Sequence, residues 1–401
     1  MNTTQQPAWL REAQEHYTDS GAREQLSAAY AIAAATPTPP DERSRTLVKL
    51  LLNLRSDATM LAAGLLVEPW RKKQLDLDAL AASPCHGVIG LLQALDDLAL
   101  IDQLHEQEQS DIERLRKMLL AMASDMRAVI LKLALQVVLM RNLSAYSAQE
   151  QQRFALQTRD LLAPLANRLG IAQLKSELED RALRVLEPDI YQEISGELEG
   201  KRVDRERYIN RIINLLRYKL TDAGVHVKRL YGRVKHINSI YLKMKRKGLR
   251  FEQLNDIRAV RVEVENEADC YHTLSVVNEL WQPIAEEFDD YIAHPKANGY
   301  QALHVTLMSK LGQWIEVQIR SDRMDEIAEQ GFAAHWKYKE GAEITEDEGE
   351  LNDWLHTIKE ILDDPQPDAM DFLDAIKLNL FASEIFVFTP KGEIKMMPAG
   401  C

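Results

Sequence analysis

The stretch between residues 233 and 320 combines cations, carboxylates and aromatic side chains in an order that suits phosphate chemistry. Phosphoryl-type transfer between nucleotides needs cations that hold phosphates, acidic ligands for Mg²⁺ and a base at the acceptor hydroxyl. The sequence offers candidates for all three roles. The candidate cations are Arg233, Lys235, Lys243 and Lys247, and the candidate carboxylates are Asp256 and Glu316.

The local pattern predicts that these side chains share faces. The glycine of GRVKH lets the backbone approach a ligand beside Arg233 and Lys235. Lys243 and Lys247 share a helix face with Ser239, so these cations can converge on one groove. Two strand faces carry the remaining polar groups, namely Glu316, Gln318 and Arg320 on one strand and Tyr300, His304 and Thr306 on another.

Each of these residues also has an ordinary structural interpretation. A strand carboxylate is usually a surface group, a tyrosine beside glycine is usually a turn residue, and a basic helix face is usually solvated. A tyrosine at the end of HPKANGY can instead stack a base, which is worth about 1–3 kcal/mol. Spacing alone therefore predicts an anion-binding α/β domain and leaves open whether it is an enzyme.

The elements that position these residues change character near residue 200. From residue 41 to about 186 the apolar spacing is helical, with breaks predicted at TPTPPDE (36–42) and LEPD (186–189). Helices and strands then interleave, which predicts an α/β domain. We expect helices at 203–222, 236–247 (closed by Gly248) and 268–281, and strands at 257–264, 300–309 and 313–320.

The end of the chain carries two further signals. The acidic segment after Gly341 predicts a linker followed by one or two helices, including 351–362. The last residues, EIFVFTPKGEIKMMPAGC, predict a β-hairpin that turns at 390–392. A lone hairpin is marginally stable, so we expect it to be the first piece of another domain.

Charge and composition limit the class of protein. Hydrophobic residues make up 46% and charged residues 28%, as in soluble globular proteins. The formal net charge of −13 conceals sixteen Lys and Arg against three acidic residues in 201–250, which makes RNA a candidate partner of that segment. Three scattered cysteines, no secretory signal, and charges inside the most apolar stretch (118–140) predict a cytoplasmic chain that does not span a membrane.

The ordered motifs resemble the synthetase domain of the RelA/SpoT homologue family of (p)ppGpp enzymes over about 230–341. They are GRVKHINSIYLKMKRKG, NDIRAVRVEV, EFDDYIAHPKANGYQALHVT and IEVQIRSDRMDEIAEQGFAAHWKYKEG. The resemblance implies a nucleotidyltransferase-like mixed-sheet α/β fold that acts in the stringent response with Mg²⁺ as cofactor. It implies transfer of the β,γ-pyrophosphate of ATP to the 3′-hydroxyl of GDP or GTP, giving AMP and ppGpp or pppGpp.

The resemblance also implies roles for single residues. Asp256 and Glu316 match the Mg²⁺-linked carboxylates, and Glu316 also matches the base toward the 3′-hydroxyl. The ATP-binding residues would be Arg233 and Arg261, flanking adenine, with Lys235 and Lys243 on the phosphates. The GDP- or GTP-binding residues would be Lys296, Asn298, Tyr300 (stacking on guanine), His304 and Gln318.

The motif of Glu287, Asp289 and Asp290 (E-x-D-D) resembles the synthetase-only RelA branch, whereas bifunctional relatives carry R-x-K-D. This implies a preference for GDP.

The N-terminal helical region resembles the family's HD hydrolase domain but lacks its Mn²⁺ ligands, which are His and Asp. Val67 and Glu68 replace a His-Asp pair, Leu135 and Val138 replace an Asp and a His, and Arg43 stands near the upstream His. We therefore expect a pseudo-hydrolase domain that does not hydrolyse (p)ppGpp.

The resemblance divides the chain into five parts. These are an N-terminal extension (1–40), a degenerate HD domain (41–195), a synthetase domain (196–341), an acidic linker with helices (342–383) and the truncated start of a TGS domain (384–401). Longer relatives continue with domains that engage uncharged tRNA and the ribosome, so those partners are expected only through domains absent here.

Two other functions compete with this interpretation. A nucleotidyltransferase that extends RNA or a small molecule usually carries a Gly-Ser loop followed by D-x-D, and neither occurs near Asp256. A non-catalytic RNA- or ribosome-binding regulatory fragment would use the basic 201–250 segment. Retention of Asp256, Glu316 and Tyr300 together argues against a lost active site.

Overall fold

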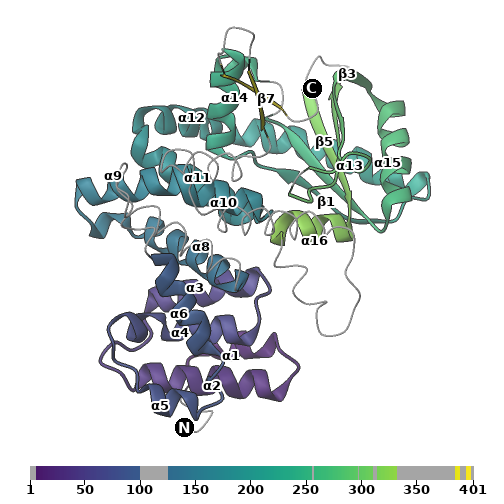
Figure 1. Cartoon of the computed structure of the whole chain (residues 1–401). Coiled ribbons are helices and arrows are strands. Elements are labelled where there is room, and N and C mark those ends of the chain that lie inside the picture. The colour runs from purple at the N-terminus through teal and green to yellow at the C-terminus, as the bar shows by residue number, and fades with distance from the viewer. Residues whose placement is uncertain are drawn as a thin grey trace. The chain divides into compact units, whose positions relative to one another are not determined.

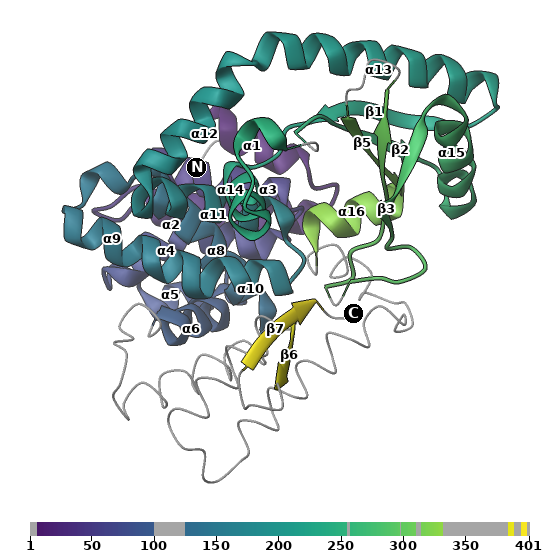
Figure 2. The same cartoon turned by 90° about the horizontal axis from the view of Figure 1, so that it is seen from above.

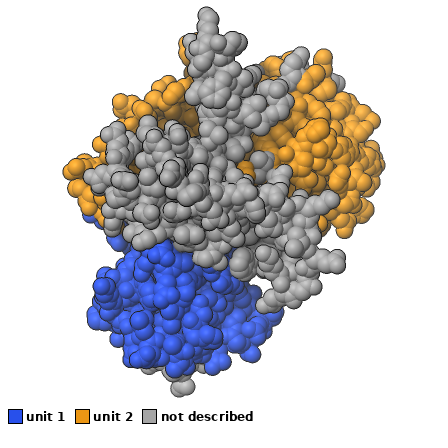
Figure 3. All heavy atoms as spheres, in the orientation of Figure 1, with its two compact units in different colours: residues 1–145, 336–381 blue, residues 146–335, 382–401 orange. Residues whose placement is uncertain are grey.

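The computed structural model describes residues 6–99, 125–254, 257–296, 298–309, 314–331, 384–388 and 394–398. These residues form two compact units, drawn in blue and orange in Figure 3. The helical unit contains the described residues up to 145, and the sheet unit contains those from 146 onward. This order, helices first and a mixed sheet second, confirms the predicted fold class.

The helical unit is built from short amphipathic helices around an aliphatic core. Aspartates cap several of them: Asp57 accepts a hydrogen bond from the Met60 amide, and Asp41 forms a capping box with Ser44. The helices are α1 (Ala8–Glu15), α2 (Ser20–Ala34), α3 (Glu42–Asn53), α4 (Ala58–Arg71), α5 (Leu77–Ala81), α6 (Val88–Ala99), α8 (Met126–Arg141) and the 3₁₀ turn η3 (Leu143–Ala145).

The first two helices lie in the segment that the sequence assigns to an N-terminal extension. Helix α2 packs on α4 and α1 packs on α3, so residues 8–34 are part of the helical unit. Helix α8 is buried along most of its length, as predicted for the described part of 118–140. Among the described residues, no helix is both long and apolar enough to cross a bilayer.

The sheet unit begins with helices and continues with alternating strands and helices (Figure 1). Its helices are α9 (Ala148–Gln157), η4 (Thr158–Leu162), α10 (Ala163–Arg168), α11 (Ala172–Leu186), α12 (Pro188–Gly200), α13 (Arg202–Asp222), α14 (Ile237–Lys247), η5 (Phe251–Gln253), α15 (Glu267–Leu280) and α16 (Asp322–Gln330). Its strands are β1 (Val227–Arg233), β2 (Ala259–Val264), β3 (Gln282–Asp290), β4 (Leu303–Met308), β5 (Trp314–Ser321), β6 (Glu384–Phe388) and β7 (Ile394–Pro398).

Five strands form a mixed sheet in the order β1-β2-β5-β4-β3, in which only β2 and β5 pair in parallel. The predicted strands β2, β4 and β5 and helices α13, α14 and α15 are confirmed. The sequence pattern predicts no strand at the positions of β1 and β3, so both strands were missed. Both are edge strands, whose polar residues weaken the apolar alternation that marks a strand.

The sheet has one apolar face and one polar face. Leu230, Val262 and Ile319 lie on the apolar face, which α13 and α15 cover (Figure 2). Their sequence neighbours alternate to the opposite face, because successive side chains of a strand point to opposite sides. The predicted alternation of Val260, Val262 and Val264 with polar residues is confirmed.

Helices α11 and α12 pack with the sheet unit. Helix α11 contacts α14 and α16, and α12 contacts α13 and α14. A second small core joins Ile194 of α12 to Ile240 of α14 and Phe251. The boundary between the two compact units, at residue 145, therefore precedes the predicted end of the HD-like domain at residue 195. The limit at 195 stays a prediction.

The predicted chain breaks and the terminal hairpin also appear. Pro188 is the first residue of α12, where its missing amide hydrogen costs nothing. Strands β6 and β7 pair antiparallel as predicted. The predicted linker and helices of 342–383, including 351–362, and the turn at 390–392 lie outside the described residues. Whether the hairpin opens a TGS domain stays a prediction.

Gly232 should be intolerant of a side chain. It lies within β1, and a Cβ there would be 2.7 Å from Cγ2 of the stiff, buried Ile209 of α13. We expect Gly232→Ala to lower the free energy of unfolding by about 1–3 kcal/mol, measured by urea denaturation. The matched control is Gly196→Ala in α12, where a Cβ meets nothing within 4 Å. That control should be neutral or stabilising, and equal effects of the two changes would contradict the packing argument.

Candidate functional site

Cross-strand register places the polar side chains of the sheet in three rows. The first row joins Arg229, Glu263 and Arg320, the second joins Tyr231, Arg261, Gln318, His304 and Asp289, and the third joins Arg233, Ala259, Glu316 and Thr306. Residues far apart in the sequence thus share the polar face. The predicted grouping of Glu316 with Gln318 and Arg320 is confirmed.

A pocket of about 560 Å³ opens beside this polar face. Arg233 from the end of β1 and Arg261 from β2 both line it, so the structure brings together the two arginines predicted to flank adenine. The remaining wall comes from α11, α12, the β1–α14 loop and α16. It consists of Ala172, Gln173, Ser176, Glu177, Asp180, Arg181, Arg184, Tyr191, Val234, His236 and Glu329.

The wall on α11 was missed by the sequence prediction. Ser176, Asp180 and Arg184 recur at four-residue spacing, so they form one stripe on the helix. Asp180 accepts hydrogen bonds from the Asn238 amide (2.7 Å) and contacts Nδ1 of His236 (3.3 Å), so it caps α14 from another helix. A polar stripe is the only sequence signal, and it is also what a solvated helix face shows.

Tyr300, His304 and Glu316 form a hydrogen-bonded chain. The Tyr300 hydroxyl lies 2.7 Å from Nε2 of His304, and Nδ1 of His304 lies 3.1 Å from Oε1 of Glu316. A carboxylate only accepts, so Nδ1 donates to Glu316, while Nε2 shares a hydrogen bond with the Tyr300 hydroxyl. The predicted neighbourhood of the aromatic ring and the imidazole is confirmed.

Glu316 is held ionised although its side chain is only 13% exposed. Burial raises its pKa, but the hydrogen bond and charge of His304, the amide of Gln318 (3.0 Å) and the charge of Arg233 together lower it to about 2. The side-chain oxygen Oε1 of Gln318 is buried and has no hydrogen-bond partner among the described residues. A bound ligand that donates a hydrogen bond would satisfy it.

Lys296 and Asn298, which are predicted to bind GDP or GTP, make contacts within the protein. The ammonium of Lys296 lies 4.1 Å from the Tyr291 ring centre and 5.5 Å from that of Tyr300, and burial lowers its pKa. The side-chain amide of Asn298 donates to the carbonyl of Asn167 (3.1 Å) in the last turn of α10. The loop that carries both residues is therefore braced from the helical side of the sheet unit.

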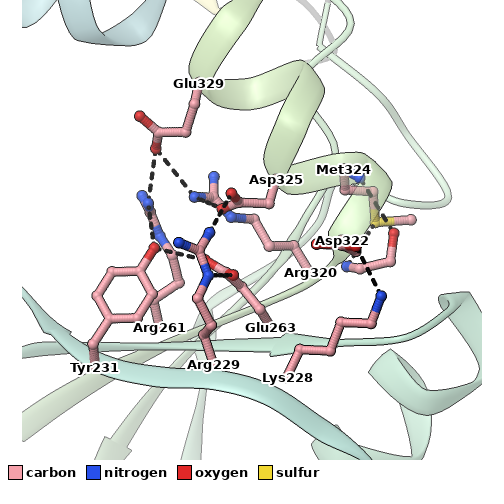
Figure 4. Close-up of polar contacts among 11 residues, drawn as sticks. Lys228, Arg229, Tyr231, Arg261, Glu263, Arg320, Asp322, Met324, Asp325 and Glu329 are labelled. Atoms are coloured by element: carbon pink, nitrogen blue, oxygen red, sulfur yellow. Dashed lines mark hydrogen bonds and ion pairs between the residues drawn. The ribbon is translucent and has the colours of Figure 1, made fainter. Parts of the chain in front are cut away.

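Arg320 belongs to a buried ionic network and is 1% exposed (Figure 4). It pairs with Asp325 of α16, which also accepts from Arg229 (3.0 Å). Arg229 pairs in turn with Glu263, which accepts from the Tyr231 hydroxyl. Burial raises the pKa of Asp325 to about 6, opposed by the charge of Arg320 and reinforced by Glu263. Arg320 is thus held inside the site by ion pairs with Asp325 and Glu329 of α16.

The E-x-D-D residues have distinct surroundings. Glu287 contacts Lys247 of α14 (3.3 Å) and Thr306 (3.3 Å). Asp290 accepts from the Ile292 and Ala293 amides and from Tyr271, so it holds the turn after β3. Asp289 pairs with His304 in the sheet register, on the polar face. A role of this motif in choosing GDP stays a prediction.

Several other residues predicted for the site do not line the pocket or lie outside the described residues. Asp256 lies outside the described residues. Lys235 and Lys243 do not line the pocket, and Lys247 is engaged by Glu287, so convergence of all four cations on one groove stays a prediction. Gly232 of GRVKH packs closely against Ile209 of α13, and the approach of a ligand to this segment stays a prediction.

The residues aligned with the hydrolase ligands lie in the helical unit. Val67 on α4 and Val138 on α8 are buried among apolar side chains, Leu135 is half-buried, and Glu68 lies 3.8 Å from Arg71. Arg43 is exposed in the first turn of α3. Within the described ranges, no group of three or more His, Cys, Asp or Glu side chains could hold a metal ion.

Comparison with known families identifies two regions of the chain. Residues 232–343 match the region found in RelA / SpoT proteins. Residues 25–172 match an HD domain. The HD match therefore covers α2 to α10 and crosses the packing boundary at 145.

Curated relatives match most of the chain. A GTP pyrophosphokinase of Myxococcus xanthus is 39% identical over 354 residues, which cover 88% of this chain and 46% of the relative. The GTP pyrophosphokinase of Escherichia coli strain K12 is 38% identical over 365 residues, 89% of this chain and 49% of the relative. A Synechocystis relative, 38% identical over 356 residues (88% and 46%), is named a probable guanosine-3′,5′-bis(diphosphate) 3′-pyrophosphohydrolase. The chain spans about half the length of these relatives.

Solved structures align less closely. The crystal structure of the small alarmone synthetase 1 from Bacillus subtilis, bound to its product pppGpp, covers 41% of this chain and is itself covered to 93%. The two are 20% identical and the TM-score is 0.30, which is too low to establish a shared fold.

Glu316 should make stability depend on pH at the acidic end. Because its pKa is lower in the folded chain than the ordinary 4.5, its contribution is fully present above about pH 4.5 and is lost as the pH falls toward 2. A shift of this size corresponds to about 3 kcal/mol. We expect Glu316→Gln to lower the free energy of unfolding at pH 6, and by less at pH 3, measured by urea denaturation.

The control for this measurement is Glu193→Gln, an exposed position on α12. It should leave the free energy of unfolding unchanged at both pH values. An equal loss for Glu316→Gln at pH 6 and pH 3 would show that its ionisation does not stabilise the fold.

Proposed function

Because the chain belongs to the RelA/SpoT family through residues 232–343, we propose that its sheet unit is a (p)ppGpp synthetase. The reaction transfers the β,γ-pyrophosphate of ATP to the 3′-hydroxyl of GDP or GTP and gives AMP with ppGpp or pppGpp. The observation that carries the proposal is the polar face of the sheet, where Arg233 and Arg261 line one pocket and Glu316, Gln318 and His304 lie beside them. This face supplies cations, an ionised carboxylate and aromatic rings together.

The pocket is the site proposed for ATP. A guanidinium is planar and stacks on aromatic rings, so Arg233 and Arg261 can hold adenine between them. Arg233 lines the pocket and acts on Glu316 only through its charge, so its guanidinium can also contact a nucleotide. Lys235 and Lys243, on the segment that follows Arg233, are proposed for the phosphates.

The acceptor nucleotide is proposed to bind over Tyr300, with Lys296, Asn298, His304 and Gln318 around it. Its arrival would break the contact between His304 and Glu316. Burial is the largest influence on Glu316 and raises its pKa, so loss of the opposing hydrogen bonds would make this carboxylate more basic. Glu316 would then take the proton of the 3′-hydroxyl, which a carboxylate of pKa near 2 does poorly.

Mg²⁺ is the proposed cofactor, with Glu316 and Asp256 as its protein ligands. The ionised state of Glu316 fits a hard divalent cation, which prefers carboxylate oxygens. Such an ion would screen the negative charge of the phosphates. The acidic Glu287, Asp289 and Asp290 motif supports GDP as the preferred acceptor through its resemblance to the synthetase-only branch.

The helical unit is proposed to be inactive as a hydrolase. Val67, Leu135 and Val138 offer no oxygen or nitrogen ligand, and Glu68 is close to Arg71. A single carboxylate does not assemble the His and Asp site of that chemistry.

The alternative of a non-catalytic RNA- or ribosome-binding fragment rests on the basic 201–250 segment. Lys201, directly before α13, and Arg202 and Arg207 of α13 are each paired with an acidic side chain within four residues. These pairs favour a solvated helix face, because paired cations have less charge left for a polyanion. Contact with RNA, uncharged tRNA or the ribosome stays a prediction.

Incubation of the chain with ATP, GDP and Mg²⁺ should yield ppGpp and AMP, measured by anion-exchange chromatography. We expect Glu316→Gln and Asp256→Asn each to lower the rate at least about 100-fold, because general-base catalysis alone contributes about 10²–10⁴. Glu193→Gln should keep the wild-type rate. Absence of product from the wild-type chain at high protein concentration would refute the proposed function.

The same chain should release no pyrophosphate from ppGpp in the presence of Mn²⁺. The reason is the replacement of metal ligands by the buried side chains of Val67 and Val138. The measurement is chromatography of the nucleotide products over hours. Release that depends on Mn²⁺ and is lost in Glu68→Gln would show that the helical unit is a working hydrolase.

A further inference from the structure

Helix α16 lies against the polar face of the sheet and places two acidic residues over it (Figure 4). The helix follows directly from β5, and Ser321 caps its first turn through a hydrogen bond from the Met324 amide. Asp325 and Glu329 are one turn apart and therefore point to the same side. Asp325 serves the interior network, whereas Glu329 reaches the pocket lining.

Glu329 joins two arginines of the sheet. Its Oε1 accepts a hydrogen bond from Nη1 of Arg261 (2.8 Å) and from Nη2 of Arg320 (3.1 Å). Arg261 also donates a hydrogen bond to the Tyr231 hydroxyl (3.2 Å) and lies 5.8 Å from the centre of that ring, and its buried Nε has no hydrogen-bond partner among the described residues. Glu329 is thus the carboxylate that neutralises Arg261, whose side chain is 11% exposed.

The contact fixes the direction of the Arg261 guanidinium. A guanidinium bonded to a carboxylate at its edge keeps its flat face open to a ring, which is the geometry for stacking on a base. Without Glu329, Arg261 and Arg320 would be two buried cations on neighbouring strands with less charge to balance them. Arg261 would then turn toward solvent or toward another acidic group.

The end of α16 is itself held in place. Gly331 has φ +55 and ψ −137, and a Cβ there would lie 2.1 Å from the Leu169 carbonyl oxygen in the α10–α11 turn. This close approach sets the position of Glu329 two residues earlier. The same turn starts α11, which forms another wall of the pocket.

We propose that Glu329 is a positioning residue for the donor nucleotide: it holds the guanidinium of Arg261 edge-on so that its face meets the base. The proposal rests on the proposed function, in which this pocket binds ATP. It extends the ATP site to a residue of α16 that does not itself stack on or neutralise the nucleotide.

The test measures affinity for a non-hydrolysable ATP analogue by titration calorimetry, together with the KM values for ATP and GDP. We expect Glu329→Gln to weaken analogue binding roughly tenfold and to raise KM for ATP, while KM for GDP stays within about twofold. Glu329→Asp, which keeps the charge on a shorter side chain, should recover part of the loss. The matched control is Asp322→Asn at the start of the same helix, where the carboxylate pairs with exposed Lys228.

A double-mutant cycle decides whether Glu329 acts through Arg261. In an Arg261→Ala background, Glu329→Gln should cause no further loss of analogue affinity. Losses that add, or unchanged binding by the single Glu329→Gln variant with an unaltered unfolding midpoint, would overturn the inference. If Glu329→Gln does not fold, the same double-mutant cycle is measured with Glu329→Asp. A wild-type chain that does not bind the analogue would overturn the proposed function and this inference together.

Discussion

The parallel pairing of β2 with β5 is the constraint on which the site depends. It places Ala259 beside Glu316, Arg261 beside Gln318 and Glu263 beside Arg320, although the partners are far apart in sequence. A slip of one residue would turn every one of these side chains to the face covered by α13 and α15. The apolar alternation of β2 and β5 prevents that slip, because a slipped register would expose the valine and isoleucine side chains of the core. Packing on one side of the sheet therefore fixes the chemistry on the other.

Charge on the polar face is balanced locally. Arg229, Arg320 and Arg261 each meet a carboxylate, from Glu263, Asp325 or Glu329. Buried ion pairs of this kind contribute little net stability, but removal of one partner leaves an expensive unpaired charge. The network therefore orients side chains more than it stabilises the fold. Its acidic members come largely from α16, so that helix belongs to the site as much as the strands do.

The central strands and the basic helices could be predicted because their apolar spacing is strong. Val260, Val262 and Val264 alternate cleanly, and Gly248 closes α14 in the left-handed conformation that the sequence indicates. The edge strands β1 and β3 could not be predicted, because each pairs with a neighbour on one side only and carries polar residues. The wall from α11 could not be predicted either, because Asp180 acts on α14 through tertiary packing, and its own helix shows no sign of that contact. Arg320 is the opposite case. The sequence places it on the correct face of its strand, but does not reveal that its guanidinium pairs with Asp325 inside the protein.

Gly331 makes a close backbone contact with the turn between α10 and α11. Backbone meets backbone there, so a side chain at position 331 would force the two segments apart. The chain leaves α16 at this point, two residues beyond Glu329. Position 331 therefore ties the helix that carries Glu329 to the turn that starts α11, so a side chain introduced there would disturb two walls of the pocket at once.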